Sequence, residues 1–330
     1  MARIEDVADR AGVSTASVSR VLSGKKNVSD EMRQRVMAAA KELDYQPNLV
    51  ARSLRSQRST TVGLIVSDVR NPFFTDVSRA VEDTVHEQGY ALYLCNTDED
   101  PEKERLYLDR MQAQNVAGII YSPTRQSAET FADLQISVPA VIIDRAVRGG
   151  HVDQVLIDNV DAAYRLTEHL IQNGYRRIAA MIGEASVTGR ERRQGYEKAL
   201  DAHDLAPPEG QTRYIPPKIE AGRKTAREIL EDAQPPDAIL TTNSLLTAGA
   251  LMAIRERGLV IPDDVALVGF DETTWGKLVE PTVTIISQPT NEIGTTAAEL
   301  LLQRVERPDR TPRSVILRGE LRIGGSSAPR

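Results

Sequence analysis

The segment Thr15–Leu22 carries side chains of the kinds that recognise DNA bases. The candidate contacts in it are Thr15, Ala16, Ser17, Ser19 and Arg20. Arg20 can donate two hydrogen bonds to O6 and N7 of guanine, and the smaller residues permit close approach to base edges. If the segment is a helix, its apolar residues share the other face: Val18, Val21 and Leu22. The chemistry that this pattern predicts is sequence-specific DNA recognition.

A helix-turn-helix motif would present this face to DNA. Before the segment, apolar residues recur at the spacing of a short amphipathic helix: Ile4, Val7, Ala8 and Ala11. Gly12 breaks that pattern, and the Ser14 hydroxyl can cap a second helix by accepting a backbone N–H bond. The second helix of such a motif enters the major groove. From these residues alone, the alternative is an ordinary helical hairpin with a solvated face rich in Ser and Thr.

A third helix and a basic segment follow the motif. After a polar loop that ends at Asn27, Ser29 can cap a helix to about Leu43, and Pro47 ends this unit. Residues 48–59 contain three arginines and no acid, and their apolar residues fit one helical face: Leu49, Val50 and Leu54. A helix this short is not stable alone in water, so we expect DNA or a partner to order it. The alternative is a basic flexible linker.

The distribution of charge supports a DNA-binding head. The chain of 330 residues has a net charge of −6. Residues 1–60 nevertheless carry 11 Lys and Arg against 7 Asp and Glu, while the remainder carries 30 against 40. A basic head on an acidic body is suited to a protein whose body stays off the DNA. The single cysteine, Cys95, excludes an intramolecular disulfide and agrees with a reducing, cytoplasmic location, and no segment is apolar enough to span a membrane.

From Thr60 onward, short apolar runs alternate with helical stretches. The runs are residues 62–66, 91–95, 117–121, 140–144, 154–158, 177–183, 237–242, 265–271 and 283–287. This alternation predicts parallel sheets covered on both faces, arranged as an α/β core of two doubly wound lobes with a ligand cleft between them. We expect a helix-turn-helix domain at 1–46, a hinge at 47–60 and the core at 61–330. Lobe 1 would comprise about 61–159 and 289–318, with a helix at 293–305 and a last strand at 314–317 in its second part, and lobe 2 about 160–287 and 319–330.

At this point several stretches together resemble one protein family. They are IEDVADRAGVSTASVSRVLSG, VSDEMRQRVMAAAKELDYQPNLVARSLRS, VGLIVSDVRNPFF, IPDDVALVGFDE and EPTVTIISQP. The chain resembles the LacI/GalR family of bacterial transcriptional repressors over essentially its full length. The resemblance implies a homodimer that binds a pseudopalindromic double-stranded DNA operator. It also implies a periplasmic-binding-protein-like core that binds a small effector, usually a sugar.

The resemblance assigns roles to the hinge and to the cleft. In the family, paired hinge helices insert a leucine from each subunit into the minor groove, and Leu54 occupies that place. Together with the residues of the second helix, the expected DNA contacts are Asn27, Asn48, Ala51, Arg52, Leu54 and Arg55. The residues that match effector-pocket positions are Phe73, Phe74, Asp144, Arg192, Asn243, Asp271 and Gln288. Trp275, the only tryptophan, could stack on a sugar ring. Ser244 stands where many family members have aspartate. The ligands of those members therefore cannot be transferred to this chain.

Each pocket candidate also has a structural alternative. Phe74 can simply pack, Asp144 and Asp271 can cap helices, and Arg192 can be a surface charge. The four histidines are scattered without the spacing of metal ligands, so we expect no metal, no cofactor and no catalysis. Two other classes of protein fit the lobes: a transport-type solute-binding protein and a sugar-processing enzyme. The absence of an export signal and the basic head favour a regulator, and no leucine heptads follow the last strand, so we expect a dimer.

Overall fold

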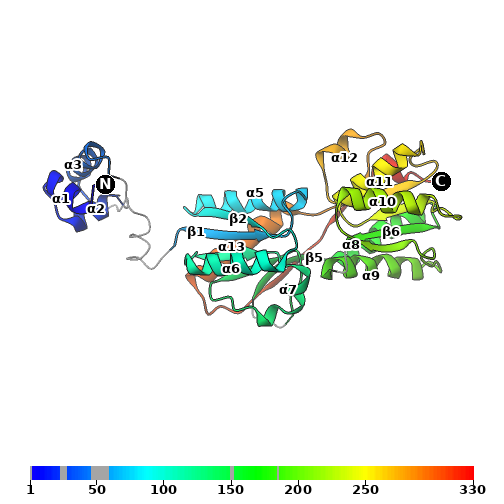
Figure 1. The fold of residues 1–330 in the computed structure, drawn as a ribbon, viewed down its shortest axis with the longest axis horizontal. Helices are drawn as coiled ribbons and strands as arrows, with labels where there is room; N and C mark the ends of the chain where they lie inside the picture. The colour runs from blue at the N-terminus through cyan, green and yellow to red at the C-terminus, as the bar shows by residue number, and fades with distance from the viewer. Residues whose placement is uncertain (1, 23–27, 46–58, 149–151, 184–185) are drawn as a thin grey trace. The chain divides into compact units, whose positions relative to one another are not determined.

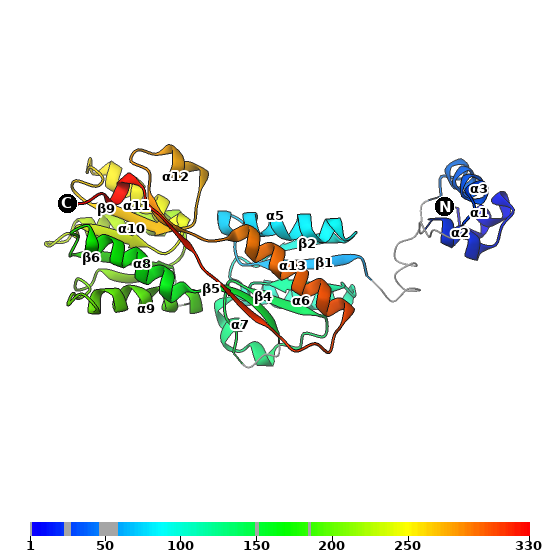
Figure 2. The same cartoon turned by 180° about the vertical axis from the view of Figure 1, so that it is seen from behind.

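The protein consists of two separate units, residues 1–59 and 60–330. The structure is a computed structural model that describes residues 2–22, 28–45, 59–148, 152–183 and 186–330. The predicted contacts at Asn27 and in the hinge (Asn48, Ala51, Arg52, Leu54 and Arg55) lie outside the described residues. Figures 1 and 2 show the chain from opposite sides. No helix among the described residues is long and apolar enough to cross a membrane.

The N-terminal unit contains three helices: α1 (Ile4–Ala11), α2 (Thr15–Leu22) and α3 (Asp30–Glu42). Gly12 ends α1 with φ of 63°, a left-handed conformation that favours glycine. Its core is made of small aliphatic side chains: Val7, Ala8, Ala11, Val18, Val21, Val36, Ala39 and Ala40. An exposed ion pair between Arg10 and Glu42, 2.6 Å apart, joins α1 to α3. The Val and Ala core allows the helices to pack closely in very few residues.

The first lobe of the core is built on a parallel sheet with strand order β11-β5-β4-β3-β1-β2. Its strands are β1 (Thr61–Val66), β2 (Ala91–Asn96), β3 (Gly118–Tyr121), β4 (Ala140–Ile143), β5 (Asp153–Ile157) and β11 (Ser314–Leu317). Helices α5 (Pro72–Glu87) and α13 (Thr290–Glu306) pack on one face. Helices α6 (Pro101–Ala113) and α7 (Arg125–Glu129) pack on the other, followed by a 3-10 turn at Phe131–Asp133.

The second lobe repeats this plan with strand order β12-β10-β9-β8-β6-β7. Its strands are β6 (Ile178–Gly183), β7 (Thr212–Ile215), β8 (Ala238–Thr241), β9 (Ala266–Phe270), β10 (Thr284–Ser287) and β12 (Glu320–Arg322). Helices α8 (Asn159–Gln172) and α9 (Val187–Asp201) cover one face, and α10 (Ile219–Leu230) and α11 (Ser244–Glu256) cover the other. The short helix α12 (Thr274–Leu278) follows β9, and a 3-10 turn lies at Gly325–Ser327.

The chain passes between the lobes three times, after β5, after β10 and after β11 (Figure 2). Parallel strands in both sheets, flanked by helices on both faces, confirm the predicted fold class. Two strands were not predicted. Strand β7 lies at a sheet edge and contains Arg213 and the exposed Tyr214. Strand β12 has three residues and pairs antiparallel with β10. These two edge strands bury little surface, and their sequences lack the apolar runs that identify the central strands.

Candidate DNA-reading face and ligand-binding cleft

The exposed face of α2 carries four of the predicted base contacts. Thr15, Ala16, Ser19 and Arg20 are exposed, while Val18 is fully buried in the core of the head. Ser17 is half-buried because its backbone N–H and hydroxyl both meet the Ser14 hydroxyl, at 3.2 and 3.0 Å. Ser14 therefore holds the first turn of α2, and the small side chains beside Arg20 leave that face open to a groove.

A cavity of about 280 Å³ lies where the carboxyl ends of the strands of both sheets meet. It is lined by residues that follow β1, β2 and β4 in lobe 1 and by residues at or after the ends of β6, β7, β8, β9 and β10 in lobe 2. Seven of the eight predicted pocket residues line it: Phe73, Phe74, Asp144, Arg192, Asn243, Asp271 and Gln288. The two doubly wound lobes thus bring residues from distant parts of the chain to one site, as the strand-end rule for α/β sheets predicts.

Arg192 is the central cation of this cavity, and it is 7% exposed. Its Nε donates to Asn159 Oδ1 at 2.8 Å, its Nη1 donates to the Thr242 carbonyl, and its guanidinium lies 4.2 Å from the Phe270 ring centroid. Burial lowers the pKa of Arg192, while Asp271 and Asp144 raise it. An arginine fixed in this way stays charged and presents its remaining N–H groups in one geometry.

Asp271 lies at the end of β9, with a φ of 73°. The Gln288 side chain donates to Oδ1 at 2.5 Å, and the Ser244 backbone N–H donates to Oδ2 at 3.3 Å. Burial raises the pKa of Asp271, and Arg192 is the strongest influence that lowers it. Both carboxylate oxygens therefore have a fixed direction toward the cavity.

Asp144 follows β4, with a φ of 68°, in the corresponding place of lobe 1. The Ser122 hydroxyl donates to its Oδ2 at 3.3 Å, and Arg145 Nε lies 3.5 Å from the same oxygen. Burial raises the pKa of Asp144, while Arg145 and Arg192 lower it. Arg145 is itself held by Glu99, at 2.6 Å between Nη2 and Oε1.

Phe73 and Phe74 begin α5 and form the apolar side of the cavity. They are each 4% exposed, and their rings meet edge to face with centroids 5.0 Å apart. Asn71 caps this helix by accepting the Phe73 N–H at 3.1 Å, and its Oδ1 also meets the Ser244 hydroxyl of lobe 2 at 3.5 Å. Both rings belong to the core of lobe 1, so packing and ligand contact are compatible roles for them.

Trp275 alone among the predicted pocket residues lies outside the lining of this cavity. It packs against the core of lobe 2 from α12 and lines two neighbouring cavities. Asn243 lines the cleft and also caps α11, because its Oδ1 accepts the Leu246 N–H at 2.8 Å. The pocket roles of all eight residues remain predictions.

Several polar residues of the cavity were not predicted from the sequence. They are Asp68, Asn71, Glu99, Arg145, Thr188 and Lys218. Asn71 stands directly before Pro72 at a helix start, which is a recognisable cap signal after a strand. Arg145 directly follows Asp144, a predicted pocket residue, and this position in the sequence is a signal that could have identified it. Glu99 has no such signal, because it lies in a loop 46 residues from the arginine that it holds.

Comparisons with known proteins match both units of the chain. Residues 3–48 match the family model of bacterial regulatory proteins of the lacI family. Residues 59–321 match the model of periplasmic binding proteins and the sugar-binding domain of the LacI family. A ribose operon repressor from Halalkalibacterium halodurans is 37% identical over 93% of this chain and 91% of the relative.

Solved structures match over nearly the whole chain. The lac repressor dimer bound to operator and the anti-inducer ONPF has a TM-score of 0.87 and 27% identity, covering 99% of each chain. A complex of the transcriptional regulator CelR with cellobiose has a TM-score of 0.73 and 32% identity, covering 99% of this chain and 100% of that one. A transcriptional regulator from Enterococcus faecium with bound ribose has a TM-score of 0.72 and 28% identity, covering 82% of this chain and 99% of that one.

Proposed function

Because the chain belongs to the LacI family and is therefore a DNA-binding transcriptional regulator, we propose that it represses transcription under the control of a sugar. A homodimer binds a pseudopalindromic operator, and a monosaccharide or monosaccharide derivative binds between the lobes. The single observation that carries the proposal is Arg192, a buried arginine in a cavity that also contains one aspartate from each lobe.

The chemistry of the cavity suits a small polyhydroxylated ligand. Carboxylates accept hydrogen bonds from pairs of hydroxyls, and the guanidinium donates to hydroxyl and ring oxygens. Among the described residues, no protein acceptor meets Arg192 Nη2, which leaves this group for a ligand. The Phe73 and Phe74 rings offer an apolar surface to the C–H face of a sugar ring. At about 280 Å³, the cavity favours one sugar ring over two.

The proposed DNA contacts lie in two places. Thr15, Ala16, Ser17, Ser19 and Arg20 read the major groove, and Asn27 supports them. In the hinge, Leu54 enters the minor groove with Asn48, Ala51, Arg52 and Arg55 beside it. Two heads are needed because one α2 helix makes too few contacts, so a two-fold dimer presents one helix to each half-site.

Coupling between the two sites follows from the way the ligand is held. A sugar that contacts Asp144 and Asp271 together fixes one relation between the lobes. Allostery then requires that this relation be compatible with only one arrangement of the two hinge segments, residues 48–59. We propose that the hinges pair as helices on DNA in one state and separate in the other. Because an operator is part of the chromosome, we expect the protein to act in the cytoplasm.

Operator selection followed by a sugar titration tests the proposal. Selection from random DNA with the full chain should yield a pseudopalindrome, and fluorescence anisotropy then measures operator affinity with D-ribose, D-glucose and cellobiose. We expect one monosaccharide to change operator affinity at least tenfold, and Arg192→Gln to abolish the change but not effector-free DNA binding. If the sugars bind without affecting operator affinity, the chain is a sugar-binding protein rather than a sugar-controlled regulator. If a bound sugar is chemically converted, an enzyme activity replaces the proposal.

Base reading has its own variant. Arg20→Ala should weaken operator binding by ~1–3 kcal/mol and relax the preference for guanine at one position of each half-site. Equal loss for all DNA sequences would make Arg20 a phosphate contact.

Hydrogen exchange tests the hinge. Residues 48–58 should be protected only in the operator complex, and equal protection in the free protein would exclude a hinge that folds on DNA.

A further inference from the structure

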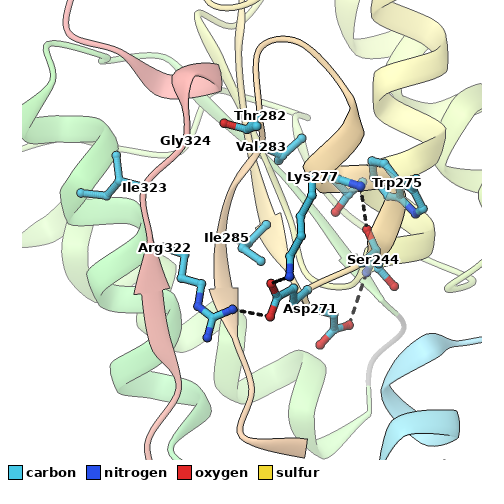
Figure 3. Close-up of a pocket in the computed structure, with 14 residues that line it drawn as sticks. Ser244, Asp271, Trp275, Lys277, Thr282, Val283, Ile285, Arg322, Ile323 and Gly324 are labelled. Atoms are coloured by element: carbon cyan, nitrogen blue, oxygen red, sulfur yellow. Dashed lines mark hydrogen bonds and ion pairs between the residues drawn. The ribbon is translucent and has the colours of Figure 1, made fainter.

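A second cavity, separate from the sugar cleft, lies in lobe 2 between α12, β10 and β12. Its volume is about 180 Å³, and its lining is mostly apolar, with Trp275, Val283, Ile285 and Ile323 among the lining residues (Figure 3). A cavity of roughly 150 Å³ with apolar walls is large enough to hold benzene. The space therefore fits one six-membered aromatic ring.

The rim of this cavity contains two cations, Lys277 and Arg322, which are paired with carboxylates but retain N–H groups for a further acceptor. Lys277 comes from α12 and Arg322 from β12, and both side chains reach the same carboxylate, Glu272 (Figure 3). Arg322 Nε also meets Glu320 at 2.9 Å. Within the described part of the chain, Arg322 Nη2 has no protein acceptor, and the Lys277 ammonium has N–H groups beyond the one that meets Glu272. A further carboxylate can therefore be accommodated beside Glu272 without displacing it.

The cover of the cavity is lightly held. Helix α12 has five residues, and none of them is buried. Leu278 at its end is 78% exposed, and Ile323 on the facing strand is 70% exposed. Trp275 packs against the core of lobe 2 and holds this helix, while the other residues of the helix can shift with little loss of packed contact and admit a ligand.

The back wall of the cavity is shared with the sugar cleft. Asp271 and Ser244 line both spaces, and the Ser244 backbone N–H bonds Asp271 at 3.3 Å between them. Glu272, which the rim cations hold, is the residue after Asp271.

From these observations, we propose that the cavity bounded by Trp275, Ile285 and Arg322 is a second ligand site, for an aromatic carboxylate with one ring. The ring occupies the apolar space, and the carboxylate meets Arg322 and Lys277 at the rim. The site is distinct from the cleft that contains Arg192, so its occupation does not depend on the sugar proposed above.

Trp275 provides a direct readout, because it is the only tryptophan of the chain. We expect sodium benzoate to change the tryptophan fluorescence of the full-length protein with a dissociation constant on the order of 1 mM or below. Benzyl alcohol keeps the ring but not the charge, and acetate keeps the charge but not the ring. Both should bind at least tenfold more weakly than benzoate. Equal binding of all three compounds would overturn the proposal.

Variants locate the binding event. Arg322→Gln should weaken benzoate binding roughly tenfold, because it removes a charged hydrogen bond. Ile285→Phe fills the cavity and should abolish binding. Phenylalanine is chosen over tryptophan at this position because a second tryptophan would disturb the fluorescence readout. Arg318→Gln is the matched control: this exposed arginine pairs with Asp161 and does not line the cavity, so affinity should stay unchanged.

Two results would contradict the site. Loss of benzoate binding in Arg192→Gln, with full binding in Arg322→Gln, would place the ligand in the sugar cleft. If Arg322→Gln or Ile323→Asp instead changes the oligomeric state in light scattering while benzoate affinity stays the same, the face is a subunit contact. Because Arg322 and Ile323 are both exposed, these variants do not depend on repacking of the core.

Discussion

Asp144 and Asp271 occupy corresponding places in the two lobes, yet they are held differently. Each follows the third strand of its sheet, counted from the edge formed by β11 or β12, and each has a left-handed backbone, with φ of 68° and 73°. Asp271 is fixed by a side-chain amide and a backbone N–H. Asp144 instead has a cation of its own lobe beside it, Arg145. A repeated fold thus provides equivalent positions with different electrostatic environments.

Arg192, the buried arginine that influences both of these aspartates, belongs to lobe 2. Arg192 lowers the pKa of both carboxyl groups, although Asp144 lies in the other lobe. Lobe 2 therefore contains both a buried cation and an oriented carboxylate that this cation influences, whereas lobe 1 contributes a carboxylate beside Arg145, which is itself paired with Glu99. This difference predicts that lobe 2 supplies most of the binding energy and that lobe 1 responds to the ligand.

The lobes also differ in how they fasten the last part of the chain. In lobe 1, Arg304 of α13 forms a buried ion pair with Asp153 at 2.6 Å, and Asp153 also accepts the Arg313 backbone N–H at 2.7 Å. In lobe 2, the buried contacts of the C-terminal segment include neutral hydrogen bonds such as that of His169 Nε2 with the Ser327 hydroxyl at 2.8 Å, and the ion pair of this segment with Glu272 is made by the exposed Arg322. The lobes should therefore differ in their response to mutation and to pH.

The largest effect is expected at the buried ion pair. Arg304→Leu leaves the fully buried Asp153 without a counter-charge, which typically costs ~3–5 kcal/mol in free energy of unfolding. Urea denaturation of the full chain measures this loss, and the double variant Arg304→Leu with Asp153→Asn should recover part of it. Ser327→Ala in lobe 2 should cost much less, about 1 kcal/mol. Equal losses in the two lobes would contradict the difference between their fastenings.

Arg192→Gln tests the cation that both aspartates share. We expect the affinity for the effector sugar, measured by calorimetry, to fall roughly 100-fold, because a charged hydrogen bond and its fixed geometry are lost. Arg192→Lys keeps the charge but not the planar fork, so its affinity should lie between the two. Unchanged affinity in both variants would exclude Arg192 from the site, and thermal melting provides the control for folding.

The sequence predicted the strands that form this site better than the contacts between its side chains. Central strands such as β1 and β9 are buried on both faces, so their apolar runs were visible, and the residues at their ends followed from the fold. What the sequence could not show is pairing across long separations. The contact of Asn71 with Ser244 spans 173 residues, and nothing local in either segment predicts it. Trp275 shows the opposite limit, since its position after β9 was visible but the direction of its side chain was not.

Exchange of each aspartate for asparagine compares the lobes directly. Asp271→Asn should lower sugar affinity roughly 30-fold, because a carboxylate that Gln288 and the Ser244 N–H already orient is replaced by a neutral amide. Asp144→Asn should lower it less than about fivefold, since Arg145 lies 3.5 Å from this carboxylate and competes with the ligand for it. The ratio of the two losses is the measurement. A larger effect at Asp144 would make lobe 1 the main source of binding energy and reverse the comparison.

The smallest effect is expected at His169, and it is a dependence on pH. Burial lowers the pKa of His169 below 6.5, its ordinary value, so the folded protein resists the proton that the unfolded chain accepts. The unfolded state then binds more protons as the pH falls below about 6.5, and stability decreases in that direction. Wild type should therefore lose melting temperature between about pH 7.5 and 5.5. His169→Gln keeps a hydrogen-bonding group beside Ser327 but cannot titrate, so its loss over the same range should be smaller. Variants at Arg304 and Asp153 in lobe 1 keep His169, so their melting temperature should change with pH as much as that of the wild type. If His169→Gln retains that slope too, the pH response does not come from the fastening of lobe 2, and this difference between the lobes has to be given up.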